Sequence, residues 1–323
     1  MIILGIETTC DETSVSIVEN GVSIISNSII SQIDLHSKYG GVVPEVASRA
    51  HFEKLPILVD EVLNKAKMKP EDIDAIAIAT EPGLVPALHV GFAFASGYAL
   101  SWNKPLIKVD HLKAHIWANF MESDEFENLK ESGKACCLLI SGGHTQLLKI
   151  EYQDGGIISE IVGTTVDDAV GEGYDKVAKM LGLAYPGGPE VDRLSKLGNS
   201  ERFHFPRPMI HDDNYNFSIS GLKSHIARTI QDLGELTEQD KYDICRCFQD
   251  AVIDVLATKT INYAKAENIK KIYLAGGVAC NETLRSEFTS RASQYGIEVG
   301  YPSPRLCTDN AEMIAGFAFV MLK

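Results

Sequence analysis

One pattern occurs twice along this chain of 323 residues, and it limits the folds that the chain can adopt. In each copy two strands flank a short polar hairpin: residues 2–6, 7–12 and 13–18 in the first copy, and residues 136–140, 141–145 and 146–150 in the second. Short apolar or alternating runs bounded by turn residues are typical of paired strands. Turns at residues 19–21 and 154–156 close the two copies. A unit repeated about one domain apart predicts an internal duplication into two similar α/β halves.

A third strand ends in a glycine-rich loop. The strand is expected at residues 271–274, the loop with Gly276 and Gly277 follows, and residues 282–293 have the pattern of a helix. Glycines between a strand and a helix let a ligand approach the backbone, and a helix N-terminus favours negative charge. Together with the two hairpins, this loop predicts two α/β domains that face each other across a nucleotide cleft.

Four longer stretches with helical apolar spacing are expected to cover the sheets: residues 44–67, 88–101, 239–266 and 310–321. The second of these is rich in Gly, Ala and Ser, so one of its faces permits close packing, either inside the core or at a subunit interface. Because no low-complexity linker separates the two halves, we expect the domains to abut at a hinge near residue 110.

Composition excludes several classes of protein. Hydrophobic residues make up 45% and charged residues 23% of the chain, as in soluble globular proteins. The sequence has no signal-peptide pattern and no run long enough to span a membrane, so we expect a cytoplasmic protein without a membrane partner. The seven cysteines lack a Cys-x-x-Cys motif and predict reduced thiols. A net charge of −14 is unfavourable for a stand-alone nucleic-acid binder, so contact with RNA requires a local basic face or partner proteins.

The spacing of His111 and His115 is the strongest sign of chemistry in the sequence. Residues i and i+4 of a helix share one face, and histidine is the commonest protein metal ligand. A polar pair that binds no metal is the alternative that spacing leaves open. Asp309 offers a third ligand, although Asp309-x-x-Glu312 before an apolar helix also has the form of a capping box with Asp309 as N-cap.

The obvious protease motif is absent from this pair. Zinc peptidases have His-Glu-x-x-His with the glutamate as general base, and Leu112 stands at that position here. A peptidase would therefore lack its base. Three ligands with an open position suit Lewis-acid chemistry instead, in which the ion polarises a carbonyl or orients a carboxylate or phosphate.

A dense run of acids lies at residues 166–177. On a helix Asp168, Glu172 and Asp175 would fall on one face, where like charges repel by ~0.2–0.5 kcal/mol per pair. Such a face is either solvated or satisfied by a cation or by the donors of a ligand. The loop that follows is open at Gly187 and Gly188, so its amides are accessible to a sugar or a carboxylate.

Taken together, these segments resemble the Gcp/TsaD family, the universal subunit that synthesises threonylcarbamoyladenosine in tRNA. The resemblance covers essentially the whole chain and includes the His111/His115 pair. The other matching motifs, in order, are GIETTCDET (residues 5–13), GVVPEVASR (41–49), SGGHTQ (141–146), DDA (167–169), YPGGP (185–189), FSISGLK (217–223), AGGV (275–278) with Asn281, and CTDN (307–310). One such motif has little specificity, but all of them in this order are highly specific.

The resemblance implies an α/β, actin-like ATPase fold of the sugar kinase and Hsp70 kind, with two duplicated domains around the nucleotide cleft. We expect an N-terminal domain at residues 1–110, completed by the C-terminal helix 306–323, and a C-terminal domain at residues 111–305. The implied activity is transfer of a threonylcarbamoyl group from threonylcarbamoyl-AMP to N6 of adenosine 37, in tRNAs that read codons beginning with A. A small-molecule kinase of the same fold and a non-catalytic scaffold subunit are the alternatives.

The resemblance also implies the site residues. By position, His111, His115 and Asp309 would bind one metal ion, iron or zinc. The residues that would bind the adenylate substrate are Leu139, Ile140, Ser141, Gly142, Gly143, Asp175, Gly188, Asp192 and Asn281. Bacterial relatives work with a catalytically inactive paralogous subunit and a small ATPase, so tRNA, threonylcarbamoyl-AMP and these two subunits are the expected partners.

Two further residues are our own candidates for catalysis. Asp11 and Glu12 lie in the first hairpin, and either carboxylate can deprotonate or orient the incoming amine. A structural acid in a turn is the alternative for each. The backbone amides of residues 142–143 and 276–277 are expected to hold the phosphate and sugar of the donor.

The sequence departs from the family's motifs at two places. Relatives commonly have Glu and Gly where this chain has Lys113 and Ala114, which changes the charge beside the histidines but keeps the ligands. Relatives also often have Gly-Pro-Gly-Leu followed by a Gly/Ser pair, where residues 81–87 of this chain are EPGLVPA. The second departure concerns the detail of one loop.

Overall fold

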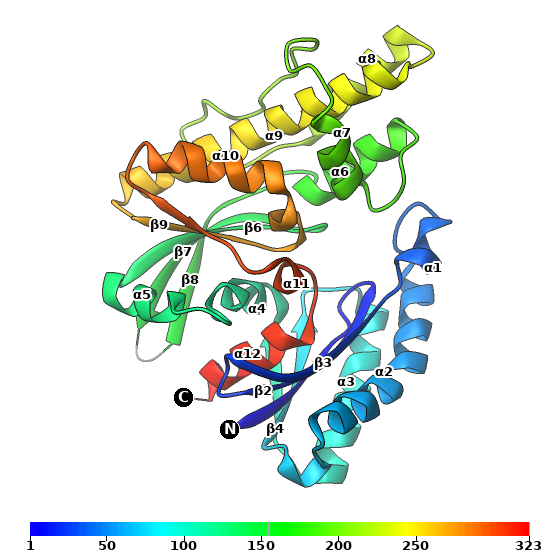
Figure 1. The fold of residues 1–323 in the computed structure, drawn as a ribbon, viewed down its shortest axis with the longest axis vertical. Helices are drawn as coiled ribbons and strands as arrows, with labels where there is room; N and C mark the ends of the chain where they lie inside the picture. Colours follow the sequence, from blue (N-terminus) through cyan, green and yellow to red (C-terminus); the bar gives the residue numbers. More distant parts are fainter. Residues whose placement is uncertain (154–155, 323) are drawn as a thin grey trace. The chain divides into compact units, whose positions relative to one another are not determined.

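A computed structural model describes residues 1–153 and 156–322 (Figure 1). Asp154 and Gly155 of the second predicted turn, and Lys323 at the end of the predicted C-terminal segment, lie outside the described residues. The chain forms two compact units: Met1–Glu131, Tyr152–Ile157 and Pro302–Lys323 make up the first, and Ser132–Glu151 and Ile158–Tyr301 the second. Residues 111–131 therefore lie in the first unit, whereas the sequence-based boundary stands at residue 110.

The first sheet has five strands in the order β3-β2-β1-β4-β5. Its central strand pairs antiparallel with β2 and parallel with β4. Asn20 and Gly21 both have positive φ angles, of 53° and 80°, as a tight hairpin turn between β2 and β3 requires. The strands are β1 (Ile2–Glu7), β2 (Glu12–Glu19), β3 (Ser23–Ser31), β4 (Ala75–Glu81) and β5 (Leu106–Asp110).

Helices cover both faces of this sheet. The helices α2 and α3 pack against each other and against β2 and β4, and their apolar core includes Leu4, Ile6, Leu55 and Ile78. Because neighbouring residues of a strand point to opposite faces, Gly5 faces away from that core, where it meets α12. The helices of this part are α1 (Ile33–Ser37), α2 (Pro44–Ala66), η1 (Pro70–Asp72), α3 (Val85–Trp102), α4 (His111–Trp117), η2 (Ala118–Phe120), α5 (Glu125–Ser132), α11 (Pro304–Cys307) and α12 (Ala311–Met321).

The second sheet repeats the plan of the first. Its order is β10-β9-β6-β7-β8, and its central strand again pairs antiparallel with the next strand in sequence and parallel with a later one. The strands are β6 (Lys134–Ile140), β7 (Thr145–Gln153), β8 (Gly156–Thr164), β9 (Lys271–Ala275) and β10 (Glu298–Gly300). The same order of strands in both sheets confirms the predicted duplication.

The helices of the second unit include the long α9, which packs against α7 and α10, while α6 packs against α7 and α8. They are α6 (Val170–Met180), α7 (Gly187–Ser195), α8 (Ser220–Leu233), α9 (Glu238–Ala266), η3 (Gly277–Cys280) and α10 (Glu282–Ser293). The predicted long helices are thus confirmed to within three residues at each end.

Two predictions from composition can be compared with the structure. The seven cysteines, all within the described residues, form no disulfide, as the sequence predicts. Across residues 1–153 and 156–322, no helix combines the length and the apolar character that crossing a membrane requires.

The contact of β1 with α12 gives a test of the fold. A methyl group on Gly5 would overlap the carbonyl oxygen of Ala311 and come within 2.9 Å of the Cβ of Ala315. We expect Gly5→Ala to lower the free energy of unfolding by about 1–3 kcal/mol, because overpacking forces the helix from the strand. Gly97→Ala is the matched control: Gly97 lies in α3 with open space around it, so the same substitution should stabilise by up to about 1 kcal/mol through helix propensity.

Urea unfolding of both variants beside the wild type measures these changes. A Gly5→Ala protein as stable as the wild type would show that α12 does not depend on close approach to β1.

Candidate metal centre

The two histidines lie in the short helix α4, directly after strand β5. Asp110 ends the strand and caps the helix, because its side chain accepts the backbone N–H of Lys113 at 3.0 Å. His111 and His115 are buried, and their ring centroids are 4.6 Å apart. The helical spacing predicted from the sequence is therefore confirmed, and both imidazoles lie on the same side of the helix.

Asp309 joins these histidines from the far end of the chain. Its Oδ1 lies 3.0 Å from Nε2 of His115 and 3.4 Å from Nε2 of His111. The alternative role as N-cap of α12 is wrong, because Asn310 is the cap and accepts the backbone N–H of Met313 at 2.9 Å. Glu312, the other half of the supposed capping box, instead accepts a hydrogen bond from Asn27.

These three residues fit a metal ion. Their ligand atoms lie within 4.8 Å of one another. A tetrahedral ion with bonds of about 2.1 Å separates its ligand atoms by about 3.4 Å, close to the distances from Asp309 to the two rings. Two imidazoles and one carboxylate are the donor set of three-ligand zinc sites and of non-haem iron sites with open positions. The donor set therefore suits either iron or zinc.

Glu7 contacts this cluster and was not identified from the sequence. It ends the buried strand β1, and its carboxylate has no exposure to solvent. One oxygen lies 2.9 Å from Nδ1 of His111, and the other accepts the backbone N–H of Thr9 at 2.5 Å. A charged residue at the end of an apolar strand was the signal that could have revealed it.

The charges of the cluster depend on one another. Burial opposes a charge on His111, but the carboxylates of Glu7 and Asp309 outweigh it and raise the pKa of this imidazole well above its ordinary value. Burial likewise opposes a charge on Asp309, yet the two histidines hold the pKa of its carboxyl below the ordinary value. Burial lowers the pKa of His115. Without a metal ion, the cluster thus carries its positive charge on His111.

Of the two candidate catalytic acids, Asp11 lies in the turn between β1 and β2, and Glu12 is the first residue of β2. Asp11 is buried, and its backbone carbonyl accepts the N–H of Gln32. Burial and the neighbouring charges of Asp11 and Asp309 raise the pKa of Glu12 from 4.5 to about 10. In the metal-free protein Glu12 is therefore protonated at neutral pH, where it can donate a hydrogen bond but cannot accept a proton.

The residues expected to bind the adenylate all lie in the second unit. Leu139 and Ile140 are buried in strand β6, so only their backbone can meet a ligand. Ser141 lies in the loop after this strand, where its hydroxyl accepts the backbone N–H of His144. Gly142 and Gly143 follow in the same loop, exposed and with nothing within 4 Å of where a side chain would begin. Their amides are thus accessible to a ligand.

The remaining expected ligands of the adenylate take part in hydrogen bonds within the protein. Asp175 accepts the backbone N–H of Gly187. At Gly188, as at Gly142, no atom lies within 4 Å of where a side chain would begin. Asp192 is mostly buried and accepts the hydroxyl of Thr283 at 2.6 Å. Asn281 is the N-cap of α10.

Gln249 of α9 connects two of these residues, and sequence reasoning missed it. Its side chain is fully buried. Its amide nitrogen donates to Asp192 at 3.1 Å and to Ser195 at 2.8 Å, while its oxygen accepts from Asn281 at 2.8 Å and Tyr174 at 3.3 Å. This amide holds four side chains that come from α6, from α7 and from the N-cap of α10. No periodicity or spacing in the sequence could reveal such a role, because the partners are 32 to 75 residues away.

The run of acids at residues 166–177 does not form the predicted stripe. Helix α6 begins at Val170, so Asp168 precedes the helix. Lysines of the chain neutralise the run: Asp168 pairs with Lys223 and Lys176, and Lys176 also pairs with Glu172 at 2.6 Å. Asp168 and Glu172 are therefore satisfied by cations within the protein.

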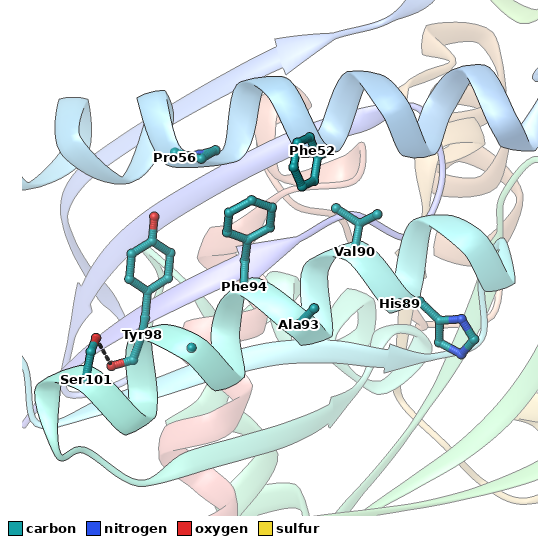
Figure 2. Close-up of a pocket in the computed structure, with 9 residues that line it drawn as sticks. Phe52, Pro56, His89, Val90, Ala93, Phe94, Tyr98 and Ser101 are labelled. Carbon is teal, nitrogen blue, oxygen red and sulfur yellow. Dashed lines mark hydrogen bonds between the residues drawn. The ribbon is translucent and has the colours of Figure 1, made fainter.

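An apolar groove of about 580 Å³ lies between α2 and α3 (Figure 2), and its lining includes none of the candidate metal ligands. The residues that line it are Phe52, Pro56, His89, Val90, Ala93, Phe94, Gly97, Tyr98 and Ser101. The helix with small residues thus has two roles. Ala87, Gly91, Ala95 and Ala99 belong to its buried face, and the groove runs along another face.

Known proteins match this chain over nearly its whole length. Residues 23–316 match the TsaD family of tRNA N6-adenosine threonylcarbamoyltransferases. The chain is 47% identical over 322 residues to the tRNA N6-adenosine threonylcarbamoyltransferase of Clostridium perfringens (strain SM101), a match that covers 99% of this chain and 93% of the relative. It is 46% identical over 323 residues to the protein of the same name from Thermosipho africanus (strain TCF52B), covering 100% and 95% of the two chains.

Solved structures support the fold. A ROK family protein from Streptococcus pneumoniae, in complex with sucrose, matches with a TM-score of 0.55 and 15% identity, covering 99% of this chain and 97% of that chain. At this identity the likeness concerns the fold alone. It confirms the actin-like ATPase fold with two mixed α/β sheets.

The raised pKa of Glu12 predicts how stability depends on pH. Between pH 4.5 and about 10 the folded metal-free protein holds a proton on Glu12 that the unfolded chain has lost, so this residue makes stability fall as pH rises. We expect Glu12→Gln to remove this contribution. The slope of the unfolding free energy against pH should then become less negative, by an amount that corresponds to up to about one bound proton. The variant should therefore gain stability relative to the wild type from pH 5 to pH 9.

Denaturant unfolding of chelator-treated protein across this range measures the slope. Glu53→Gln, at an exposed position of α2, is the control and should leave the slope unchanged. Equal slopes for Glu12→Gln and the wild type would contradict the protonated state assigned to Glu12.

Proposed function

The chain belongs to the TsaD family and is a tRNA N6-adenosine threonylcarbamoyltransferase, and from this premise we propose which residues carry out the reaction. Family membership also excludes the alternatives of a small-molecule kinase and a non-catalytic scaffold. The proposed reaction transfers the threonylcarbamoyl group from threonylcarbamoyl-AMP to N6 of adenosine 37 in tRNAs that read codons beginning with A. The products are threonylcarbamoyladenosine in tRNA and AMP.

The observation that carries the proposal is the buried cluster of His111, His115 and Asp309. In our proposal these residues hold one ion of iron or zinc, His111 and His115 through imidazole nitrogens and Asp309 through a carboxylate oxygen. When bound, such an ion acts as a Lewis acid that polarises an oxygen of the donor.

Asp11 is assigned the proton transfer. An adenine amino group is a poor nucleophile because its lone pair is delocalised into the ring. As the amine nitrogen bonds to the carbamoyl carbon, the bond from that carbon to the phosphate oxygen breaks, AMP leaves, and the proton of the amine passes to Asp11. We assign Glu12, in the same hairpin, the role of orienting the incoming amine through a hydrogen bond.

The adenylate part of the donor is assigned to the second unit. The open backbone at Gly142, Gly143 and Gly188 supports this assignment, because phosphate and sugar oxygens need amides that no side chain covers. Gly277 has the same open space, and its neighbour Gly276 has a φ of 84° where it meets the backbone of Ile140. Leu139, Ile140 and Ser141 would form the base of this loop, and Asp175, Asp192 and Asn281 would complete the proposed site.

Partner subunits are also part of the proposal. The groove between α2 and α3 exposes Phe52 by 62%, and its ring lies 5.6 Å from that of Phe94. Such an apolar surface suits a protein partner, and we propose that the paralogous inactive subunit occupies it, with the small ATPase as a further partner. Since the chain carries a net charge of −14, partners would also help it to bind tRNA. A cytoplasmic location follows from this role.

Substitution of both histidines tests the metal centre. We expect the His111→Ala/His115→Ala protein to lose its bound ion and to form threonylcarbamoyladenosine at least about 100-fold more slowly, since even an outer-shell partner is worth 10- to 100-fold. The assay supplies threonylcarbamoyl-AMP from its forming enzyme, partner subunits and unmodified tRNA, and mass spectrometry of the nucleosides measures the product. Metal content per chain is measured separately.

His204→Ala is the matched control, because His204 is exposed in the second unit. It should keep both metal and activity. A double-histidine variant that retains its ion and its rate would rule out the proposed centre.

The role of Asp11 has its own test. Asp11→Asn keeps the size of the side chain but cannot accept the proton, so we expect the rate of product formation to fall by about 100-fold or more. Asp34→Asn, at an exposed position of α1, should not change the rate. A folded Asp11→Asn protein with an unchanged rate would leave Asp11 a structural residue of the hairpin.

A further inference from the structure

We propose that Glu7 is the positioning residue of the metal centre: its carboxylate holds the Nδ1–H of His111 and thereby directs Nε2 of the same ring to the ion. This inference rests on the proposed function of His111 as a metal ligand. Glu7 lies within the motif at residues 5–13, but neither the expected site residues nor the mechanism above gives it a role.

The hydrogen bond fixes which nitrogen of His111 can bind metal. A carboxylate can only accept, so the 2.9 Å contact between Glu7 and Nδ1 of His111 requires the proton on Nδ1. Nε2, which lies 3.4 Å from Oδ1 of Asp309, is then the atom that offers a lone pair when the ring is neutral. Metal-ligating histidines generally donate their second nitrogen to a carboxylate or carbonyl in this way, which also makes the ligand more basic.

The burial of Glu7 argues that this contact serves a function. Glu7 is wholly buried at the end of a strand whose other residues are apolar, and a buried carboxylate is costly unless it is paired. Its two oxygens are engaged by His111 and by the backbone of Thr9. An apolar residue would fill the same space without this cost, so the fold alone gives no reason for a carboxylate here.

The second histidine shows why Glu7 matters. Nδ1 of His115 is buried and has no hydrogen-bond partner among the residues that the structure describes. Only His111 therefore has a carboxylate that orients its ring from outside the cluster. The contact also ties the centre to the hairpin, because the same carboxylate holds the backbone of Thr9, two residues before Asp11.

Glu7→Gln gives the sharpest test. If the new amide keeps its oxygen on the N–H of Thr9, its NH₂ group faces Nδ1 of His111 and favours the tautomer with the proton on Nε2, the atom that should bind metal. We expect affinity for Zn²⁺, measured by competition with a chromophoric chelator, to fall about 10- to 100-fold. The absorption spectrum of the Co²⁺-loaded protein should also change, because the ligand field of His111 changes; loss of structural support alone would not alter it.

Glu312→Gln is the matched control. Glu312 is a buried carboxylate of the same unit, bonded to Asn27 and Arg305 and outside the metal cluster. It should leave Zn²⁺ affinity and the Co²⁺ spectrum unchanged. Glu7→Asp withdraws the carboxylate by one methylene group and replaces Glu7→Gln if the latter does not fold; the same 10- to 100-fold loss is expected.

The possible outcomes separate the two proposals. Wild-type protein that binds no Zn²⁺, or His111→Ala that binds it as tightly as the wild type, overturns the metal centre itself. Wild-type binding that His111→Ala abolishes, together with wild-type affinity and spectrum in the folded Glu7 variant, overturns the role of Glu7 alone. A weaker affinity and a changed spectrum in the Glu7 variant, with the Glu312→Gln control unchanged, support the inference.

Discussion

The close packing of α12 on β1 is the constraint on which the cluster of candidate metal ligands depends. Gly5 in the middle of β1 leaves room for the carbonyl of Ala311 and the side chain of Ala315. This approach places the turn before α12 beside α4, so that Asp309 meets His115 across 194 residues of sequence. Asn310 caps the helix and leaves Asp309 available to the histidines. The three-residue cluster is therefore possible because Asn310, and not Asp309, caps the helix.

The hairpin that carries Asp11 is held by a different set of contacts. His51 of α2 donates from Nε2 to the carbonyl of Cys10 at 3.0 Å and accepts the hydroxyl of Thr13 at Nδ1, at 2.8 Å. Burial lowers the pKa of His51, which favours the neutral ring that this pattern of one donor and one acceptor requires. Neutral hydrogen bonds on both sides of Asp11 thus help to set its position.

Much of the fold could be predicted because its signals are local. The strand–hairpin–strand pattern identified β1, β2, β6 and β7, and apolar spacing identified the long helices. Strands β3 and β8 were not predicted, because both have irregular burial along their length and no continuous apolar run. Their pairing with the hairpins decides that they are strands, and that information is not local.

The same reason explains which site residues could be predicted. His111 and His115 are four residues apart, so their contact follows from the geometry of a helix. Glu7 contacts His111 across 104 residues, and Gln249 contacts Asp192 across 57. Such pairs depend on how the sheets and helices pack. Asp309 lies between these cases, because its residue type pointed to a ligand while its position also fitted a cap, and only the fold decides between the two.

The electrostatics of the metal-free cluster favour the binding of a cation. Glu7, Asp11 and Asp309 all contribute to the raised pKa of Glu12, so the hairpin and the cluster share one field of negative charge. In the metal-free protein this negative charge favours a proton on His111 and a proton on Glu12, because it raises the pKa of both groups. A divalent ion between the histidines and Asp309 would offset the same charge without either proton, since it leaves His111 neutral and attracts the carboxylate of Glu12. Metal binding should therefore release protons, and it should convert Glu12 toward its ionised form.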